Sequence, residues 1–199
     1  MAPLTAYAAK LRQGGAGEVP DFDPLDGGID ARVLFLFEKP GPMTAESGKR
    51  PGSGFISRNN DDCTAEATFH FMRQAGIPRK LTVIWNVIPW WNGTRKVTAR
   101  ELHQGAECVE QLLKLLPALS AVVMVGRSAG RAKPYLATTG LPFFDSYHPS
   151  PIVKATSPEK WKMIPSQWAN VMTLVEASPR AERAGMSQLH AAHVRLKAM

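Results

Sequence analysis

Residues 31–37 read ARVLFLF, and this apolar run is followed at once by the polar turn EKPG at 38–41. Three further short runs have the same character: LTVIW at 81–85, LSAVVMV at 119–125 and LPFFDSY at 141–147. Continuous rather than alternating hydrophobicity, in short runs rich in β-branched and aromatic residues, is typical of strands buried on both faces. The four runs therefore predict a central, mainly parallel four-stranded sheet.

Segments with helical patterns separate and follow these runs. They span residues 62–75, 98–116, 128–137 and 158–176. Asp62 is a candidate N-cap for the first segment, which Gly76 and Pro78 would end. Pro165 is expected to disturb the middle of the last segment. Strands alternating with helices predict an α/β protein with three layers, α/β/α.

The length and composition of the chain fit one domain over residues 1–199. With 199 residues and 44% hydrophobic content, the chain can bury one core of ordinary size, and it contains no internal repeat. Residues 1–28 carry several Gly, Pro and Asp residues and are expected to form an irregular N-terminal arm. The core is expected to span 29–177, and a surface helix 178–199.

No targeting or membrane signal is apparent in the sequence. There is no charged leader followed by an apolar segment, and no apolar run approaches the roughly 20 residues that span a bilayer. We therefore expect a cytoplasmic protein with no membrane partner. Cys63 and Cys108 lack CxxC spacing, which disfavours a disulfide framework or a zinc site, so neither a metal nor a cofactor is expected.

The charge of the chain points to an anionic partner. There are 24 Lys and Arg residues against 17 Asp and Glu residues, a net charge of +7. Arg58, Arg95, Arg127 and Lys154 follow the predicted strands, so positive charge should border the carboxyl edge of the sheet. Membrane surfaces also attract such charge, but no basic helix with bulky apolar anchors is evident. Nucleic acid is the favoured partner.

Polar side chains follow each predicted strand. Glu38, Asn86, Arg127 or Ser128, and His148 stand at these four places. Ligands of open α/β sheets bind outside the carboxyl ends of the strands, so these residues should share one crevice. His148 belongs to the segment HPSP, in which two prolines restrict the backbone. The alternative for this segment is a rigid loop whose histidine caps a helix or bonds a carbonyl.

Four ordered motifs resemble the uracil-DNA glycosylase superfamily. They are FEKPG at 37–41, GSGFISRN at 52–59, NVIPWW at 86–91 and YHPSP at 147–151, within a resemblance that covers about Val33 to Val171. The chain is most similar to the bacterial and archaeal branch that carries an iron–sulfur cluster. Such a cluster requires four cysteine ligands, and only Cys108 lies near an expected position. The resemblance therefore implies a cluster-free member.

The resemblance implies a repair enzyme that flips uracil out of DNA and hydrolyses its N-glycosidic bond. Phe55 would stack on the uracil, Asn86 would pair with its edge, and His148 would face its O2 atom. A terminal amide offers one donor and one acceptor to uracil, and clashes with the reversed pattern of cytosine. A donor aimed at O2 stabilises the negative charge that develops on the departing base. The products would be free uracil and abasic DNA, released by a monomer.

Three positions depart from the pattern of the family. Phe37 stands where the family normally has glycine. Lys39 stands where the best-known branch places its water-activating aspartate. Glu38 could instead orient water or stabilise the cationic sugar, the alternative being a surface carboxylate paired with Lys39. Gly41 stands where a bulky tyrosine excludes the methyl group of thymine in that branch, so the exclusion of thymine must come from elsewhere or be weak.

Candidate DNA contacts lie around the crevice. They are Arg58, Arg127, Ser150, Ile152, Val153 and Lys154. Ile152 and Val153 could enter the base stack as an apolar wedge, or could cover the following helix.

Two other functions remain open on the sequence. One is a non-catalytic or weakly catalytic binder of uracil-containing or abasic DNA. The other is a glycosylase for another deaminated or mismatched base. No lysine is placed as an amine nucleophile, so strand-cleaving lyase activity is not predicted.

Overall fold

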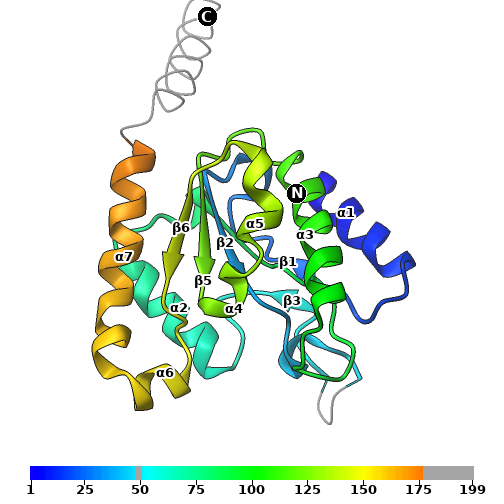
Figure 1. Cartoon of the computed structure of the whole chain (residues 1–199), viewed down its shortest axis with the longest axis horizontal. Helices are drawn as coiled ribbons and strands as arrows, with labels where there is room; N and C mark the ends of the chain where they lie inside the picture. Colours follow the sequence, from blue (N-terminus) through cyan, green and yellow to red (C-terminus); the bar gives the residue numbers. More distant parts are fainter. Residues whose placement is uncertain (48–50, 177–199) are drawn as a thin grey trace, which may run out of the picture.

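The centre of the protein is a four-stranded, all-parallel sheet in the order β4-β2-β5-β6 (Figure 1). The computed structural model describes residues 1–47 and 51–176. The strands are β2 (Val33–Phe37), β4 (Thr82–Asn86), β5 (Ala121–Val125) and β6 (Phe143–Ser146). Each lies within one of the four apolar runs or extends it by one residue, and the predicted α/β fold with a parallel sheet is confirmed.

The strand order creates a switch point beside β2. The chain leaves β2 for its neighbour β4, and then crosses back to β5 on the other side of β2. In register, Phe35 pairs with Ile84 of β4 and Val123 of β5. Phe37 pairs with Asn86, so β2 and β4 end level with each other. Parallel sheets with this reversal form a crevice at the carboxyl ends of the strands.

Helices cover both faces of the sheet (Figure 1). On one face α7 contacts α2, and α1 and α3 lie on the other. The helices are α1 (Ala2–Gln13), α2 (Cys63–Gln74), α3 (Ala99–Leu113), α4 (Arg127–Gly130), α5 (Lys133–Leu136), α6 (Pro151–Thr156) and α7 (Pro158–Glu176). Short 3-10 helices are η1 (Gly28–Asp30), η2 (Pro42–Thr44), η3 (Arg79–Leu81) and η4 (Ala137–Thr139). None of the described helices is long and apolar enough to cross a membrane.

Large aromatic side chains fill the two core layers. Trp168 of α7 packs edge-on against Phe35, with ring centroids 5.1 Å apart. On the other side, Trp85 stacks on Phe22 with centroids 3.7 Å apart and planes 9° from parallel. Phe35 pairs with Ile84, and successive strand residues alternate between faces, so Trp85 points to the opposite layer from Phe35. This burial on both sides explains the continuous hydrophobic runs.

Residues 1–28 were predicted to form an irregular arm, and this is wrong for the first half of the segment. Ala2–Gln13 form α1, in which Leu4, Tyr7 and Ala8 are buried. Tyr7 also donates a hydrogen bond to the Cys108 carbonyl oxygen at 2.7 Å, which attaches this helix to α3. The apolar positions 4, 7 and 8 have helical spacing, and this outweighs the later Gly and Pro residues in setting the local structure.

A second, two-stranded parallel sheet was not expected from the sequence. It joins β1 (Asp21–Phe22) to β3 (Phe55–Ile56). Strands of two residues carry no periodic signal, and this pairing depends on segments that are far apart in the chain.

Two predicted helices differ from the structure. The expected helix 128–137 is divided into α4, α5 and η4, because Pro134 is favourable only in the first turn of a helix. Pro165 does not break α7, which continues from Pro158 to Glu176 with Ile164 and Trp168 fully buried beside it. The helix expected over 178–199 lies outside the described residues.

Candidate functional site

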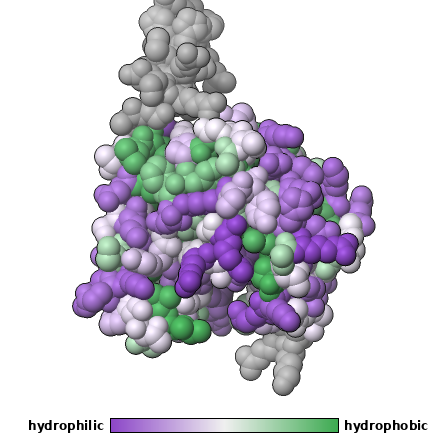
Figure 2. All heavy atoms as spheres, viewed as in Figure 1, coloured by the Kyte–Doolittle hydropathy of each residue, from purple (hydrophilic) through white to green (hydrophobic). Residues whose placement is uncertain are grey.

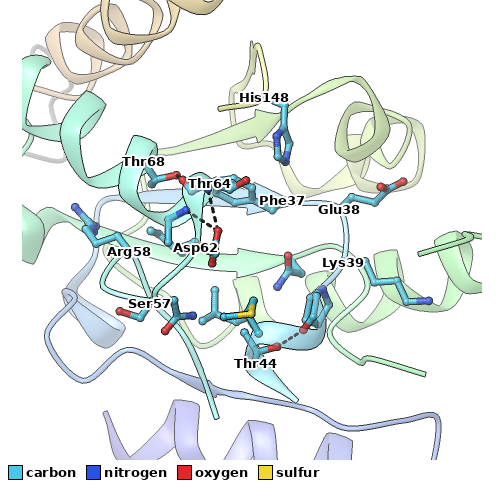
Figure 3. A pocket seen from close by; sticks show the side chains of 18 of the residues that line it. Phe37, Glu38, Lys39, Thr44, Ser57, Arg58, Asp62, Thr64, Thr68 and His148 are labelled. Carbon is cyan, nitrogen blue, oxygen red and sulfur yellow. Dashed lines mark hydrogen bonds between the residues drawn. The ribbon is translucent and has the colours of Figure 1, made fainter. Parts of the chain in front are cut away.

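A cavity of about 260 Å³ lies at the carboxyl edge of the sheet. Three strand ends contribute to it through Phe37, Asn86 and His148, and the segment from Ile56 to Thr68 forms another wall (Figure 3). Glu38 lies at its edge. The sequence predicted that Glu38, Asn86 and His148 would meet, and they do; Arg127 and Ser128 do not line the cavity.

Asn86 offers a free amide to the cavity. It is the last residue of β4 and is 4% exposed. Its backbone is fixed beside β2, because Val87 N donates to the Phe37 carbonyl oxygen at 2.7 Å. No described residue makes a hydrogen bond with its side chain, so one donor group and one acceptor remain for a ligand.

His148 points into the cavity from the turn after β6 (Figure 3). Burial lowers its pKa to about 4, so the imidazole is neutral at neutral pH. Its Nδ1 atom is buried and has no hydrogen-bond partner among the described residues. A neutral imidazole has one N–H donor and one acceptor, and it can therefore donate to a ligand without carrying charge.

Gly126 allows His148 to take this position. The backbone of Gly126, directly after β5, has φ +88°, and a Cβ atom there would lie 3.0 Å from His148 Cβ. Glycine adopts such a φ without the steric cost that other residues incur. The imidazole therefore packs directly on the backbone at the end of β5.

The segment HPSP is held by hydrogen bonds from two helices. Ser150 is the N-cap of α6, and its Oγ accepts from Val153 N at 3.4 Å. Gln167 of α7 accepts from Tyr147 N at 3.1 Å. Trp168 Nε1 donates to Ser146 Oγ at 2.7 Å. The ends of this turn are thus fixed on both sides of His148.

Glu38 pairs with a different residue from the one considered on the sequence. Its Oε1 lies 3.2 Å from Arg131 Nη2, and in Figure 3 its carboxylate is turned away from His148. Lys39 Nζ instead lies 2.9 Å from Glu101 Oε1 and donates to Asn92 Oδ1 at 2.7 Å. The alternative considered on the sequence, a Glu38 carboxylate paired with Lys39, is therefore wrong. Lys39 instead links the EKPG turn to Glu101 at the start of α3.

Phe55 does not reach the cavity. It belongs to β3 and is 39% exposed, whereas the next residue, Ile56, lines the cavity wall. Adjacent strand residues point to opposite sides, which explains the difference. The aromatic residue that does line the cavity is Phe37. The expectation that Phe55 faces a bound base is therefore not met in this structure.

Gly41 lines the cavity without adding a side chain to its wall. A Cβ atom at this position would make only ordinary contact with Arg95, 3.6 Å from its Nη2 atom. Arg95 is exposed and lines the same side of the cavity. The sequence predicted Arg95 as part of the positive charge bordering the carboxyl edge of the sheet, and the structure brings it to the cavity from the loop after β4.

Arg58 lies inside the protein rather than at a DNA-facing rim. Its Nη2 is 3.2 Å from Asp26 Oδ1 and 2.5 Å from Thr82 Oγ1, and the residue is 5% exposed. Burial raises the pKa of Asp26 to about 6, although Arg58 opposes this shift. Arg58 was predicted to contact DNA. The structure contradicts this, because the guanidinium is buried and bound to Asp26 and Thr82.

The remaining predicted DNA residues differ in exposure. Ile152 is 73% exposed, whereas Val153 is half-buried. Lys154 lies over the Trp161 ring at 5.5 Å from its centroid, and Arg127 is exposed. Figure 2 shows a face on which hydrophilic and hydrophobic atoms are mixed, and one of its hydrophobic groups lies at the lower left, where α6 lies in the same view.

These features define an α/β protein with a cavity at the switch point of a parallel sheet. The chain belongs to the uracil DNA glycosylase superfamily, whose family model matches residues 24–171. Members of this superfamily are typically DNA glycosylases, which implies a glycosylase-like function and a DNA substrate.

One solved structure is similar over most of the chain. It is the solution NMR structure of a protein from Methanosarcina acetivorans described as a "putative Uracil DNA glycosylase". The two are 19% identical with a TM-score of 0.48, over 78% of this chain and 97% of the other. No curated protein matches the sequence.

Proposed function

We propose that this protein is a monofunctional uracil-DNA glycosylase that hydrolyses the N-glycosidic bond of a flipped-out uracil and leaves an abasic site. The observation that carries the proposal is the presence of the unpaired Asn86 amide and the neutral His148 imidazole in one cavity. Excision of a uracil would make the protein a base excision repair enzyme, with free uracil and abasic DNA as its products.

Asn86 supplies the selection for uracil in this proposal. Its amide N–H₂ donates to uracil O4, and its amide oxygen accepts from uracil N3–H. Cytosine presents the reverse pattern at these positions, so a fixed amide would leave its own groups and those of cytosine unpaired. The backbone that carries this amide is held where Val87 N donates to the Phe37 carbonyl oxygen, and Asn86 is 4% exposed.

His148 supplies the stabilisation of the leaving base. As the C1′–N1 bond breaks, its electron pair moves to the base and negative charge develops on O2. A neutral imidazole N–H can donate to that oxygen, and loss of one such donor typically costs a hundredfold or more in rate. The low pKa of His148 keeps the imidazole neutral over the pH range of a cell.

The DNA strand would lie along the exposed positive and apolar residues near the cavity mouth. In this proposal the exposed side chains of Arg95 and Arg127 contact phosphates, and Ile152, which is 73% exposed, enters the base stack of a duplex. In this proposal Ser150 contributes as the N-cap of α6, the helix that carries Ile152. Val153 and Lys154 of the same helix lie beside Ile152 and contact the DNA with it. The protein is proposed to act as a monomer.

The residues present do not fit an iron–sulfur cluster. The chain has two cysteines, Cys63 in α2 and Cys108 in α3, and a four-cysteine donor set is lacking. We assign no step to such a group, and place this chain as a cluster-free relative of the iron–sulfur branch.

A second candidate is a glycosylase for another deaminated or mismatched base. The glycine at position 41 favours it, because this residue places no side chain in the cavity that could exclude a substituent on the base.

One experiment separates these functions from simple binding. Oligonucleotides with a single uracil, a thymine mismatch, hypoxanthine or xanthine are incubated with the protein and then treated with alkali. Alkali cleavage at uracil supports the proposal, and cleavage only at another base supports the second candidate. Binding to uracil-containing DNA without any cleavage would contradict both.

A further inference from the structure

We propose that Asp62 is a catalytic carboxylate, which faces the reacting sugar and accepts a proton from the attacking water. This inference rests on the proposed glycosidic hydrolysis. Position 39 is a lysine, so the carboxylate that activates the attacking water must come from elsewhere in the cavity.

Two carboxylates line the cavity in the part of the chain that the structure describes, Glu38 and Asp62. Glu38 is tied to Arg131 at 3.2 Å and is directed away from His148. Asp62 projects from the opposite wall, and Figure 3 shows its carboxylate between the α2 backbone and the middle of the cavity. Of the two, Asp62 is the carboxylate that makes no ion pair with any residue in 1–47 or 51–176.

The geometry of α2 fixes Asp62 in one orientation. Its Oδ1 accepts from Thr64 N and Ala65 N, both at 2.9 Å, as the N-cap of the helix. Two donors on one oxygen leave the other oxygen, Oδ2, without a partner among the described residues. A side chain that is held in this way needs no reorganisation before it acts. The cap thus aims a free carboxylate oxygen at the cavity.

The cations of the cavity do not neutralise this group. Arg58 is paired with Asp26, and Lys39 with Glu101. Arg95 lies on the other side, next to Gly41. Asp62 is therefore free to interact with positive charge that the substrate itself develops.

Hydrolysis of the glycosidic bond creates such a charge. The C1′–N1 bond breaks with both electrons going to the base, and the sugar acquires oxocarbenium character. A water oxygen then forms the bond to C1′, one of its protons passes to Asp62 Oδ2, and the departing base takes up a proton from solvent. The carboxylate stabilises the cationic sugar and accepts the proton, whereas His148 stabilises the anionic base.

The alternative for Asp62 is a helix cap with no part in the chemistry. The two roles can be separated, because asparagine and serine cap helices about as well as aspartate. Asp62→Asn keeps the cap and removes the charge. Asp61→Asn is the matched control, since Asp61 is the adjacent exposed carboxylate and does not line the cavity.

The test is single-turnover excision of uracil from a duplex oligonucleotide, together with DNA affinity and thermal unfolding. We expect Asp62→Asn to lower the excision rate by about a hundredfold or more, with affinity and Tm close to those of the wild type. Asp61→Asn should remain within about threefold. In Asp62→Ser, added formate should restore part of the lost rate, which it would not do for a role in folding alone.

The failure of this inference is distinguishable from that of the proposed function. Excision by the wild type with an unchanged rate in Asp62→Asn would overturn the role of Asp62 and leave the glycosylase proposal intact. A slow Asp62→Asn enzyme with a clearly lower Tm and no response of the Ser variant to formate would also overturn it. Absence of base excision by the wild type would overturn both.

Discussion

His148 and Phe37 meet edge to face at the carboxyl edge of the sheet, with ring centroids 5.5 Å apart and planes at 88°. Phe37 ends β2, and His148 follows β6, so the contact joins a central strand to an edge strand. Both side chains line the cavity. The position of the imidazole is therefore set by strand packing as well as by its own turn, and this gives several predictions.

Gly126→Ala should displace His148. The new Cβ would lie 3.0 Å from His148 Cβ on a backbone with φ +88°, so we expect a loss of about 1–3 kcal/mol of stability and at least a tenfold lower excision rate. Chemical unfolding and single-turnover assays measure both. Gly140→Ala is the control, since its φ is +68° and nothing lies within 4 Å of the added atom. Equal losses of excision rate in the two variants would mean that backbone strain at a positive φ lowers the rate by itself. The contact between Gly126 and His148 would then have no specific role.

The buried His148 should make stability depend on pH. Its pKa is about 4 in the folded protein and near 6.5 when unfolded, so between these values the unfolded chain binds more protons. The free energy of unfolding should then fall as the pH falls from 6.5 to 4, by roughly 3 kcal/mol at most from this group. Asp26, with its pKa raised to about 6, acts in the opposite direction between about pH 4 and 6.

Asp26 contributes equally to the free energy of unfolding of the wild type and of His148→Asn. Its contribution therefore cancels when the two free energies are subtracted. Urea unfolding at pH 7 and pH 4.5 should show a larger acid-induced loss for the wild type than for the variant. Identical pH dependence in the two proteins would mean that His148 is not buried as described.

The pair formed by Lys39 and Glu101 should stabilise the EKPG turn. The Lys39 side chain is 3% exposed, so Glu101→Gln leaves a buried ammonium group with weaker acceptors. We expect a loss of about 2–4 kcal/mol in urea unfolding. Glu159→Gln breaks the exposed pair with Lys162 and should cost well under 1 kcal/mol. A double-mutant cycle with Lys39→Met measures the coupling, and an interaction energy near zero would contradict this role.

The sequence predicted the sheet and the meeting of Asn86 with His148, because both depend on local signals. Continuous apolar runs marked the strands, and parallel strands end at a common edge. Asp62 was predicted as the N-cap of a helix, which the structure confirms, but not as a cavity residue. Phe55 and Arg58 could not be placed in this way. Their positions depend on the pairing of β3 with β1 and on Asp26, which is 32 residues from Arg58 in the chain. Two-residue strands and distant ion-pair partners leave no periodic pattern.

Ile152→Ala should impair the processing of duplex DNA more than that of single strands. Ile152 is 73% exposed on α6, four residues after His148, and only a duplex requires a stacked base to be expelled. We expect a severalfold larger drop in excision from duplex than from single-stranded oligonucleotides. Leu174→Ala, a change at another exposed apolar residue, on α7, serves as the control. Equal losses on both substrates would argue against a wedge.

The most direct test of the account is single-turnover excision of uracil by the wild type and by Asn86→Asp. The substituted side chain keeps the shape of the amide but has no N–H donor for uracil O4, and its charge opposes the anionic base. We predict alkali-labile sites at uracil with the wild type and at least a hundredfold lower rate with the variant, at similar thermal stability. Equal rates for the two proteins, or intact uracil in the wild-type reaction, would contradict it.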